Sequence, residues 1–162
     1  MDLMLPVGRF YHWAYVVEDV GAAMASFTGA FGLRWATVLR GPRGRIRHRQ
    51  LGDLENDTVI AFSIDGPPHI ELVERRPGTL WDLPGTGMHH AGMWVDDVVW
   101  QSERLAALGM PLVAHGLDAQ GRMARTAFHE TDTGALVELL DRSLRPAFET
   151  WMAGGDLVID ER

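Results

Sequence analysis

Two stretches of this chain repeat one pattern of residues that could bind a metal ion. Residues 12–20 read HWAYVVEDV and residues 90–98 read HAGMWVDDV, so each is a histidine, an apolar strand and an acidic pair that can open a helix. Each half also closes with a similar strand, which carries Glu71 in the first half and Glu138 in the second. One histidine and one glutamate in matching places are what a duplicated fold needs to build one metal site between its halves.

Alternation of side chains along a strand predicts that these four residues face one enclosed space. Next to His12, Trp13 is expected on the opposite face, packed in the core under the helices. The apolar neighbours of Glu71 and Glu138 are also expected to face the helices, which turns both carboxylates inward. Inward carboxylates are unfavourable unless they are paired or bound to a cation. We therefore predict that His12, Glu71, His90 and Glu138 bind one divalent metal ion, of which Zn, Ni, Co, Fe and Mn suit such nitrogen and oxygen ligands.

The elements that must position these residues follow one order, β-α-β-β-β, in both halves. For the first half we predict a strand over 10–17, a helix over 21–32, a strand over 33–40, a turn over 41–44, a possible polar strand over 45–51, and a hairpin of strands over 58–64 and 69–74. For the second half we predict a strand over 88–95, a helix over 98–108, and strands over 111–115, 122–129 and 135–140.

The chain is therefore expected to form a single domain over residues 1–162 that consists of two modules. Module one covers about 8–76, a linker covers 77–87, module two covers about 88–141, and a C-terminal tail over 142–162 includes a short helix near 146–152. The linker is rich in glycine and proline, which is typical of a connection between halves.

Composition excludes several other functions. The 162 residues include no cysteine, so disulfides, thiolate ligands and thiol nucleophiles are excluded, and no lysine, so lysine-based catalysis is excluded as well. The net charge of −7 argues against nucleic-acid binding. No apolar run is long enough to span a membrane, and the N-terminus does not resemble a secretory signal, so we expect a cytoplasmic protein.

The chain resembles the vicinal oxygen chelate superfamily, which includes glyoxalase I, methylmalonyl-CoA epimerase, extradiol dioxygenases and bleomycin-resistance proteins. The resemblance covers roughly residues 10–141 and is most similar to a glyoxalase-like branch. It is carried by the first repeat, by GPPHIEL at 66–72, by HHAGMWVDD at 89–97 and by DTGALVEL at 132–139. It implies an α+β fold, in which paired βαβββ modules form an open, cup-shaped mixed or antiparallel sheet with the helices outside.

The resemblance also implies a function. The metal positions of the superfamily map onto His12, Glu71, His90 and Glu138, and four ligands resemble glyoxalase I more than the dioxygenases. A metal-dependent proton-transfer isomerase, epimerase or lyase acting on a small oxygen-chelating substrate is the leading hypothesis, with Glu138 or Glu71 as the catalytic base. The alternatives are a metal-independent drug-binding protein of the bleomycin-resistance type and an Fe(II) extradiol-type dioxygenase. A homodimer is also expected, because an open sheet leaves strand edges to cover.

Three further residues near the predicted ligands have two readings each. His69 shares the face of Glu71 and is assigned to the substrate pocket, although a structural role beside the preceding prolines is the alternative. Trp94 shares the face of His90 and is either a substrate-pocket wall or core filling. His89 is expected on the opposite face, as a structural or exposed residue.

A cluster of arginines also has two readings. It could bind a carboxylate, a phosphate or a coenzyme A tail at the rim of the cup. We favour the alternative, a solvated edge strand that avoids aggregation. The cluster consists of Arg40, Arg43, Arg45, Arg47 and Arg49.

Overall fold

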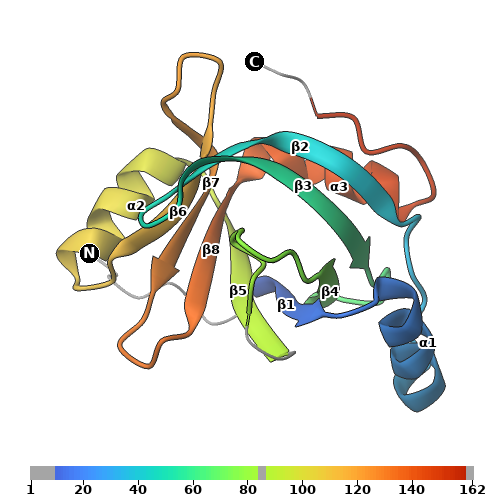
Figure 1. Cartoon of the computed structure of the whole chain (residues 1–162). Coiled ribbons are helices and arrows are strands. Elements are labelled where there is room, and N and C mark those ends of the chain that lie inside the picture. Colours follow the sequence, from blue (N-terminus) through green and yellow to red (C-terminus); the bar gives the residue numbers. More distant parts are fainter. Residues whose placement is uncertain (1–9, 84–86, 160–162) are drawn as a thin grey trace.

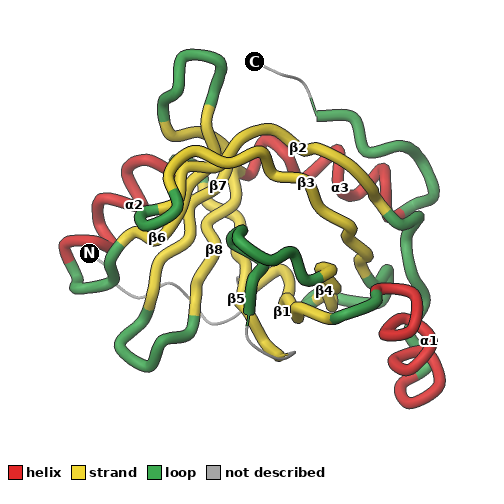
Figure 2. The backbone as a smooth tube through the Cα atoms, in the orientation of Figure 1, coloured by secondary structure: helices red, strands yellow, loops and turns green. Residues whose placement is uncertain are grey.

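The sheet of this protein closes on itself. The computed structural model describes residues 10–83 and 87–159. In this part of the chain, eight strands follow the order β1-β4-β3-β2-β6-β7-β8-β5, and β5 pairs with β1 to complete a barrel. Figures 1 and 2 show the strands curving around a common centre, with α1 and α2 on opposite outer sides. The α+β class with a curved mixed sheet and outer helices is confirmed.

Each half has the predicted β-α-β-β-β order. The first half contains β1 (Phe10–Val17), α1 (Val20–Phe31), β2 (Leu39–His48), β3 (Gly52–Phe62) and β4 (His69–Glu74). The second contains β5 (Gly87–Val95), α2 (Val98–Ala107), β6 (Leu112–Leu117), β7 (Met123–Glu130) and β8 (Leu136–Asp141). A short 3₁₀ turn η2 (Arg142–Leu144) and the helix α3 (Arg145–Met152) follow. None of the described helices has the length and apolar character needed to cross a bilayer.

The repeated acidic pair starts the first helix of each half, as predicted. Asp19 accepts a hydrogen bond from the backbone N–H of Ala22 at 2.7 Å, and Asp97 accepts one from Trp100 at 2.9 Å. Both aspartates have extended backbone, which is the geometry of an N-cap. These caps fix where β1 and β5 end, and so they fix the position of each histidine relative to its helix.

The two central strands place the four predicted ligands by reciprocal pairing. β1 and β5 are antiparallel, with His12 opposite Gly92 and Ala14 opposite His90. In the parallel pairs β1–β4 and β5–β8, Ala14 lies opposite Glu71 and Gly92 opposite Glu138. In both halves, therefore, the small residue two positions after the histidine is flanked by the glutamate of its own half and by the histidine of the other half.

The predicted turn over 41–44 is wrong, because β2 runs through it. Gly41 and Gly44 have φ values of 95° and 85°, which these residues adopt without a steric penalty. A register shift between Pro42 and Arg45 absorbs the irregularity in the β2–β3 ladder. The strand predicted over 33–40 accordingly begins only at Leu39.

β2 also closes the barrel. Its residues 45–48 pair with residues 114–117 of β6, so the edge strands of the two halves cover each other within one chain. The sheet is in this respect more closed than the expected open cup. The homodimer was expected because an open sheet leaves strand edges uncovered. At β2 and β6 these edges are paired with each other, so this reason does not apply there.

The C-terminal tail is part of the core. Its helix α3 matches the one predicted near 146–152, and Trp151 is 1% exposed. The indole N–H of Trp151 donates to the carbonyl of Thr37 at 2.9 Å, and Phe148 packs on Phe62 and Trp94. The segment therefore stabilises the barrel by covering one side of its interior.

The prediction that Trp13 lies in the core is wrong. Its side chain does point away from His12, but it is 40% exposed. The helices α1 and α2 pack mainly on β3, β4, β7 and β8. On the outer face of β1, Tyr15 packs on Phe27 of α1, whereas Trp13 stays largely exposed. Alternation along the strand gave the correct face but could not show how far each helix extends over it.

Candidate metal centre

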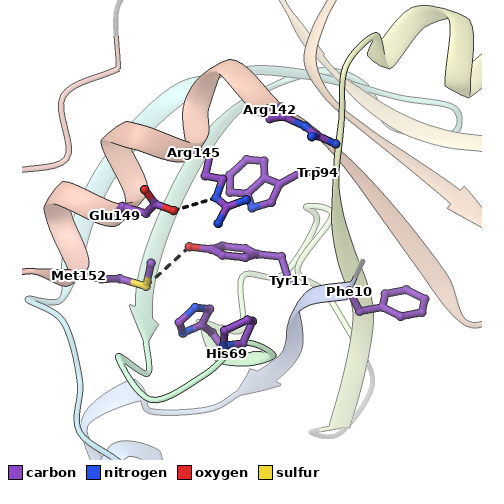
Figure 3. Close-up of a pocket in the computed structure, with 9 residues that line it drawn as sticks. Phe10, Tyr11, His69, Trp94, Arg142, Arg145, Glu149 and Met152 are labelled. Carbon is purple, nitrogen blue, oxygen red and sulfur yellow. Dashed lines mark hydrogen bonds and ion pairs between the residues drawn. The ribbon is translucent and has the colours of Figure 1, made fainter. Parts of the chain in front are cut away.

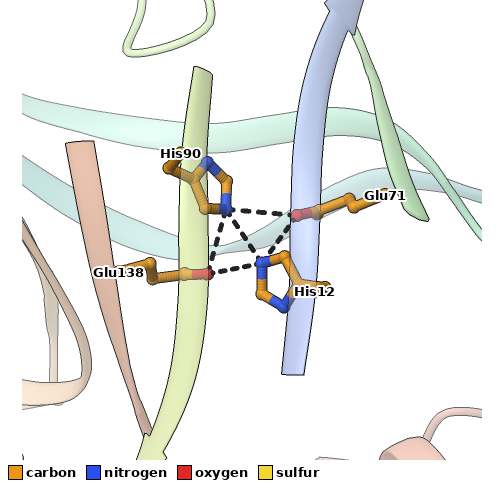
Figure 4. A group of neighbouring side chains, drawn as sticks. All are labelled: His12, Glu71, His90 and Glu138. Atoms are coloured by element: carbon orange, nitrogen blue, oxygen red, sulfur yellow. Dashed lines mark hydrogen bonds and ion pairs between the residues drawn. The ribbon is translucent and has the colours of Figure 1, made fainter. Parts of the chain in front are cut away.

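Four buried side chains from four strands meet inside the barrel (Figure 4). The two imidazole Nε2 atoms of His12 and His90 lie 3.0 Å apart. The Nε2 atom of His12 is 3.1 Å from an oxygen of Glu71 and 3.2 Å from an oxygen of Glu138. The Nε2 atom of His90 is 3.2 Å and 3.1 Å from the same two oxygens. The structure thus brings all four predicted ligands together.

The arrangement of the donor atoms fits a divalent metal. Two ligands bound at right angles at about 2.1 Å from a metal lie about 3.0 Å apart, close to the separations observed. The Nε2 atoms of His12 and His90 also face each other. Each imidazole nitrogen can bind a metal through its lone pair. That these residues bind a metal stays a prediction, which the geometry supports.

The charges of the site suit a cation. Burial opposes the charged forms of all four side chains, but the interactions between them outweigh it. Glu71 and Glu138 raise the pKa of His12 to about 9 and raise the pKa of His90, while the histidines lower the pKa of both glutamates. Both carboxylates are therefore ionised at neutral pH, and a metal ion that binds here displaces protons from the imidazoles.

A neighbouring histidine orients His90. The Nε2–H group of His89 donates to the carbonyl of Leu80 at 2.9 Å, and burial lowers the pKa of His89 to about 4, so this ring is neutral. Its Nδ1 atom then accepts a hydrogen bond of 2.9 Å from Nδ1–H of His90. This chain of hydrogen bonds directs the Nε2 lone pair of His90 towards the other three ligands, as in many metal-binding histidines.

The prediction that His89 is structural or exposed on the opposite face is therefore corrected. The residue is 8% exposed and contacts a predicted ligand. A register shift in the β1–β5 ladder, between the pairs Ala14–His90 and Tyr15–Met88, inserts His89 as an extra residue. Such a bulge brings two successive side chains to one side of the strand. A single sequence shows the histidine pair but not this bulge.

Replacing His89 with leucine is expected to weaken metal binding by about 10- to 100-fold, because His90 loses the acceptor that fixes its ring and tautomer. The measurement is a titration of Zn²⁺ against a competing chelator, with melting temperatures as a check on folding. His115→Leu serves as the control, since the ring of His115 is hydrogen-bonded to the carbonyl of Gly116 and is not part of the four-residue cluster. Equal zinc affinity in the two variants would contradict the role of His89.

The two glutamates are held differently. Thr126 donates a hydrogen bond of 2.7 Å to Oε1 of Glu138, while Oε2 of the same carboxylate faces the histidines. In the described part of the chain, Oε1 of Glu71 receives no such hydrogen bond. Glu138 is therefore anchored in its position, and Glu71 is the carboxylate with more freedom to move.

A cavity of about 150 Å³ adjoins the site. His12, Glu71 and Glu138 open onto it, and Trp81 from the predicted linker forms part of its wall. The C-terminal segment covers it with Phe148, Trp151, Leu157 and Ile159. The sequence does not predict this wall, because the linker and the tail carry no pattern that shows against which strands they fold.

The two residues assigned to the substrate pocket lie elsewhere. His69 and Trp94 line a second pocket of about 320 Å³, together with Tyr11 and Arg145 (Figure 3). His69 is the first residue of β4. Its Nδ1–H donates to the carbonyl of Ser63 at 2.8 Å. The structure therefore does not place either residue in the cavity that adjoins the four ligands.

Comparison with known proteins identifies the fold and the family. The model of the glyoxalase/bleomycin resistance protein/dioxygenase superfamily matches residues 11–149. No curated protein sequence matches the chain.

Solved structures share the fold at low sequence identity. The Mycobacterium tuberculosis methylmalonyl-CoA epimerase is 19% identical, with a TM-score of 0.55 over 90% of this chain and 97% of that one. A Streptomyces coelicolor methylmalonyl-CoA epimerase variant in complex with 2-nitronate-propionyl-CoA is 17% identical, with a TM-score of 0.56 over 82% and 96%. A halotolerant catechol dioxygenase is 17% identical, with a TM-score of 0.50 over 82% and 39%. The family model covers well over half of the chain, including most of the barrel. This chain therefore belongs to the glyoxalase/bleomycin resistance protein/dioxygenase superfamily, as its resemblance implied.

Proposed function

We propose that this protein is a metal-dependent isomerase, epimerase or lyase that moves a proton on a small substrate with two adjacent oxygens. The observation that carries the proposal is the set of four nitrogen and oxygen donors, all buried and beside a cavity. A bound divalent metal would supply a Lewis acid that stabilises negative charge developing on a substrate oxygen. The nitrogen and oxygen donors suit Zn, Ni, Co, Fe or Mn.

The protein itself must supply the base, and we propose Glu71 for this role. A base has to approach the carbon-bound proton, and Glu71 has no second hydrogen bond that fixes its carboxylate in the described structure. Glu138, held by Thr126, keeps its place beside the histidines while the proton moves. His12 and His90 hold the geometry, and the aromatic wall limits access of water to the reacting atoms.

The volume of the cavity favours a small substrate. Pockets for drug-sized ligands usually measure about 300–1,000 Å³, and the cavity beside the ligands is about 150 Å³. This argues against storage of a bulky drug. The convergence of four ligands rather than three also favours proton transfer over extradiol-type chemistry.

Hydrogen–deuterium exchange tests this function. Protein loaded with one equivalent of Zn²⁺ is incubated in D₂O with small 2-hydroxy acids, 2-oxo acids and hydroxyketones, and NMR follows the C–H signal beside the carbonyl group. We expect exchange that stops when a chelator removes the metal and that is absent in His12→Ala. Failure to bind stoichiometric metal would overturn the proposal, and metal-free ligand binding or oxygen consumption with Fe²⁺ would indicate the two alternatives.

A further inference from the structure

The structure divides the arginine cluster at residues 40–49, in and directly after β2, into two kinds of residue. Three of its arginines form ion pairs at the surface, which agrees with the solvated-strand reading. The guanidinium groups of Arg45 and Arg47 lie 3.1 Å and 2.6 Å from Asp53, and that of Arg49 lies 2.6 Å from Glu130. These contacts account for most of the positive charge that the sequence places between residues 40 and 49.

Arg43 is different, because it lines the cavity beside the metal ligands. Within the described part of the chain, no carboxylate forms an ion pair with it, and its Nε atom is buried without a hydrogen-bond partner. An arginine stays charged at physiological pH even when it is buried. Arg43 as a whole is half-buried, but the buried part of its guanidinium lacks the pairing that usually offsets desolvation, which favours an anionic ligand.

An irregularity of the strand brings Arg43 to this position. Ile46 also lines the cavity, and residues three apart lie on opposite faces of a regular strand. The register shift between Pro42 and Arg45, with Gly44 in a left-handed conformation, turns both side chains to the same side. The barrel therefore departs from regular pairing at the place where this arginine enters its interior.

A second arginine reaches the cavity from the other half of the chain. Arg125 lies in β7 with φ of 68°, a strained conformation for a residue other than glycine. It lines the same cavity, beside Thr126, and a register shift in the β6–β7 ladder surrounds it. Backbone strain of this kind is often found where a side chain contacts a ligand.

The carboxylates that line the cavity are already engaged. Glu71 and Glu138 contact His12 and His90 at 3.1–3.2 Å. Among the described residues, no carboxylate of the cavity lining is therefore left to pair with Arg43, and we infer that a bound ligand supplies the anion. A planar guanidinium binds a carboxylate through two parallel hydrogen bonds, which suits a site that must also orient its ligand.

We propose that Arg43 binds a carboxylate of the substrate, so that the substrate is a short organic acid with two adjacent oxygens at one end and a further carboxylate at the other. This inference rests on the proposed function and adds the substrate class. A cavity of roughly 150 Å³ accommodates a molecule of about the size of benzene. The acid therefore has a backbone of only a few carbons, with the metal centre and Arg43 at its two ends.

Matched ligands and matched variants test the proposal. The probes are malate and its half-amide, in which a neutral carboxamide replaces the carboxylate distant from the hydroxyl group. Calorimetric titration of Mn²⁺-loaded protein is expected to show that malate binds at least about tenfold more tightly than the half-amide. Arg43→Gln should remove this preference, and Arg47→Gln, a control in the same strand, should keep it.

A structural role for Arg43 makes a different prediction. Since Arg43 has no counter-ion among the described residues, Arg43→Gln should melt at the same or a higher temperature than the parent protein without ligand. A clear loss of stability, or equal binding of malate and half-amide by the parent protein, would overturn the proposal.

Repeating the titrations without metal separates this proposal from the proposed function. One possible result is that the protein does not bind Mn²⁺ but binds malate in a way that depends on Arg43. This result would support the carboxylate site and contradict metal-dependent catalysis. The opposite result is that Mn²⁺ binds to the four predicted ligands while Arg43→Gln leaves malate binding unchanged. This result would support the metal centre and contradict the carboxylate site.

Discussion

The variant Gly92→Ala is expected to lose metal binding while its barrel stays folded. Gly92 lies directly opposite His12 in the β1–β5 ladder, and the imidazole ring covers it. A Cβ atom at this position would lie 2.0 Å from Cε1 and 2.4 Å from Nε2 of His12, far inside contact distance. Gly92 is not in the left-handed region, so the conflict is with the ring and not with the backbone.

Apart from the contacts of its Nε2 atom with the other predicted ligands, the imidazole of His12 is held only by packing in the described structure. Its Nδ1 atom is buried and has no hydrogen-bond partner in the described structure, and its ring packs edge-on against Phe62 at 5.2 Å. A methyl group on Gly92 therefore displaces the ring and moves Nε2 away from the other donors. We expect zinc affinity to fall by more than about 100-fold, since loss of a ligand exceeds the usual effect of losing its hydrogen-bond partner.

Gly29→Ala is the matched control for this variant. Gly29 lies in α1, and a Cβ atom there would meet nothing within 4 Å. Alanine in a helix interior should raise the free energy of unfolding by about 0.5–1 kcal/mol and leave zinc affinity unchanged. For Gly92→Ala, overpacking should lower the free energy of unfolding by about 1–3 kcal/mol. Parent-like zinc binding by Gly92→Ala would show that His12 is not a ligand.

The same strand pairing explains which parts of the site the sequence could predict. Alternation along regular strands placed His12 on the inner face, and the repeat assigned the equivalent face to His90. The glutamates followed from the apolar residues on either side of them. These inferences needed only the local period of a strand and the assumption that two similar halves fold in the same way.

The residues that the sequence did not predict depend on irregular strands or on distant packing. His89 and Arg43 face the interior because of register shifts, which arise from the pairing of two strands and leave no mark in the alternation of one. Trp81 and Trp151 reach the interior from segments without strand periodicity. Regular strands therefore account for the predicted metal ligands, and irregular or non-strand segments account for the wall of the cavity.

The variant Glu71→Gln is expected to lower the rate of deuterium exchange by about 10²- to 10⁴-fold at saturating zinc, since an amide cannot accept the proton as a general base does. Its zinc affinity should also fall, because one anionic ligand is lost, and the rate must therefore be measured at zinc concentrations that fill the site. Glu74→Gln, on the same strand but outside the lining of the cavity, should exchange like the parent protein.

Comparison with Glu138→Gln distinguishes the base from the fixed ligand. Glu138 is anchored by Thr126, so its main contribution is to hold the metal, and Glu138→Gln should keep a measurable part of the exchange once zinc is saturating. Thr126→Val should free the Glu138 carboxylate and weaken zinc binding, while Glu71 continues to take the proton. If Glu138→Gln instead abolished exchange at full occupancy while Glu71→Gln retained it, the two carboxylates would have exchanged roles, and the hydrogen bond from Thr126 would have to break during each turnover.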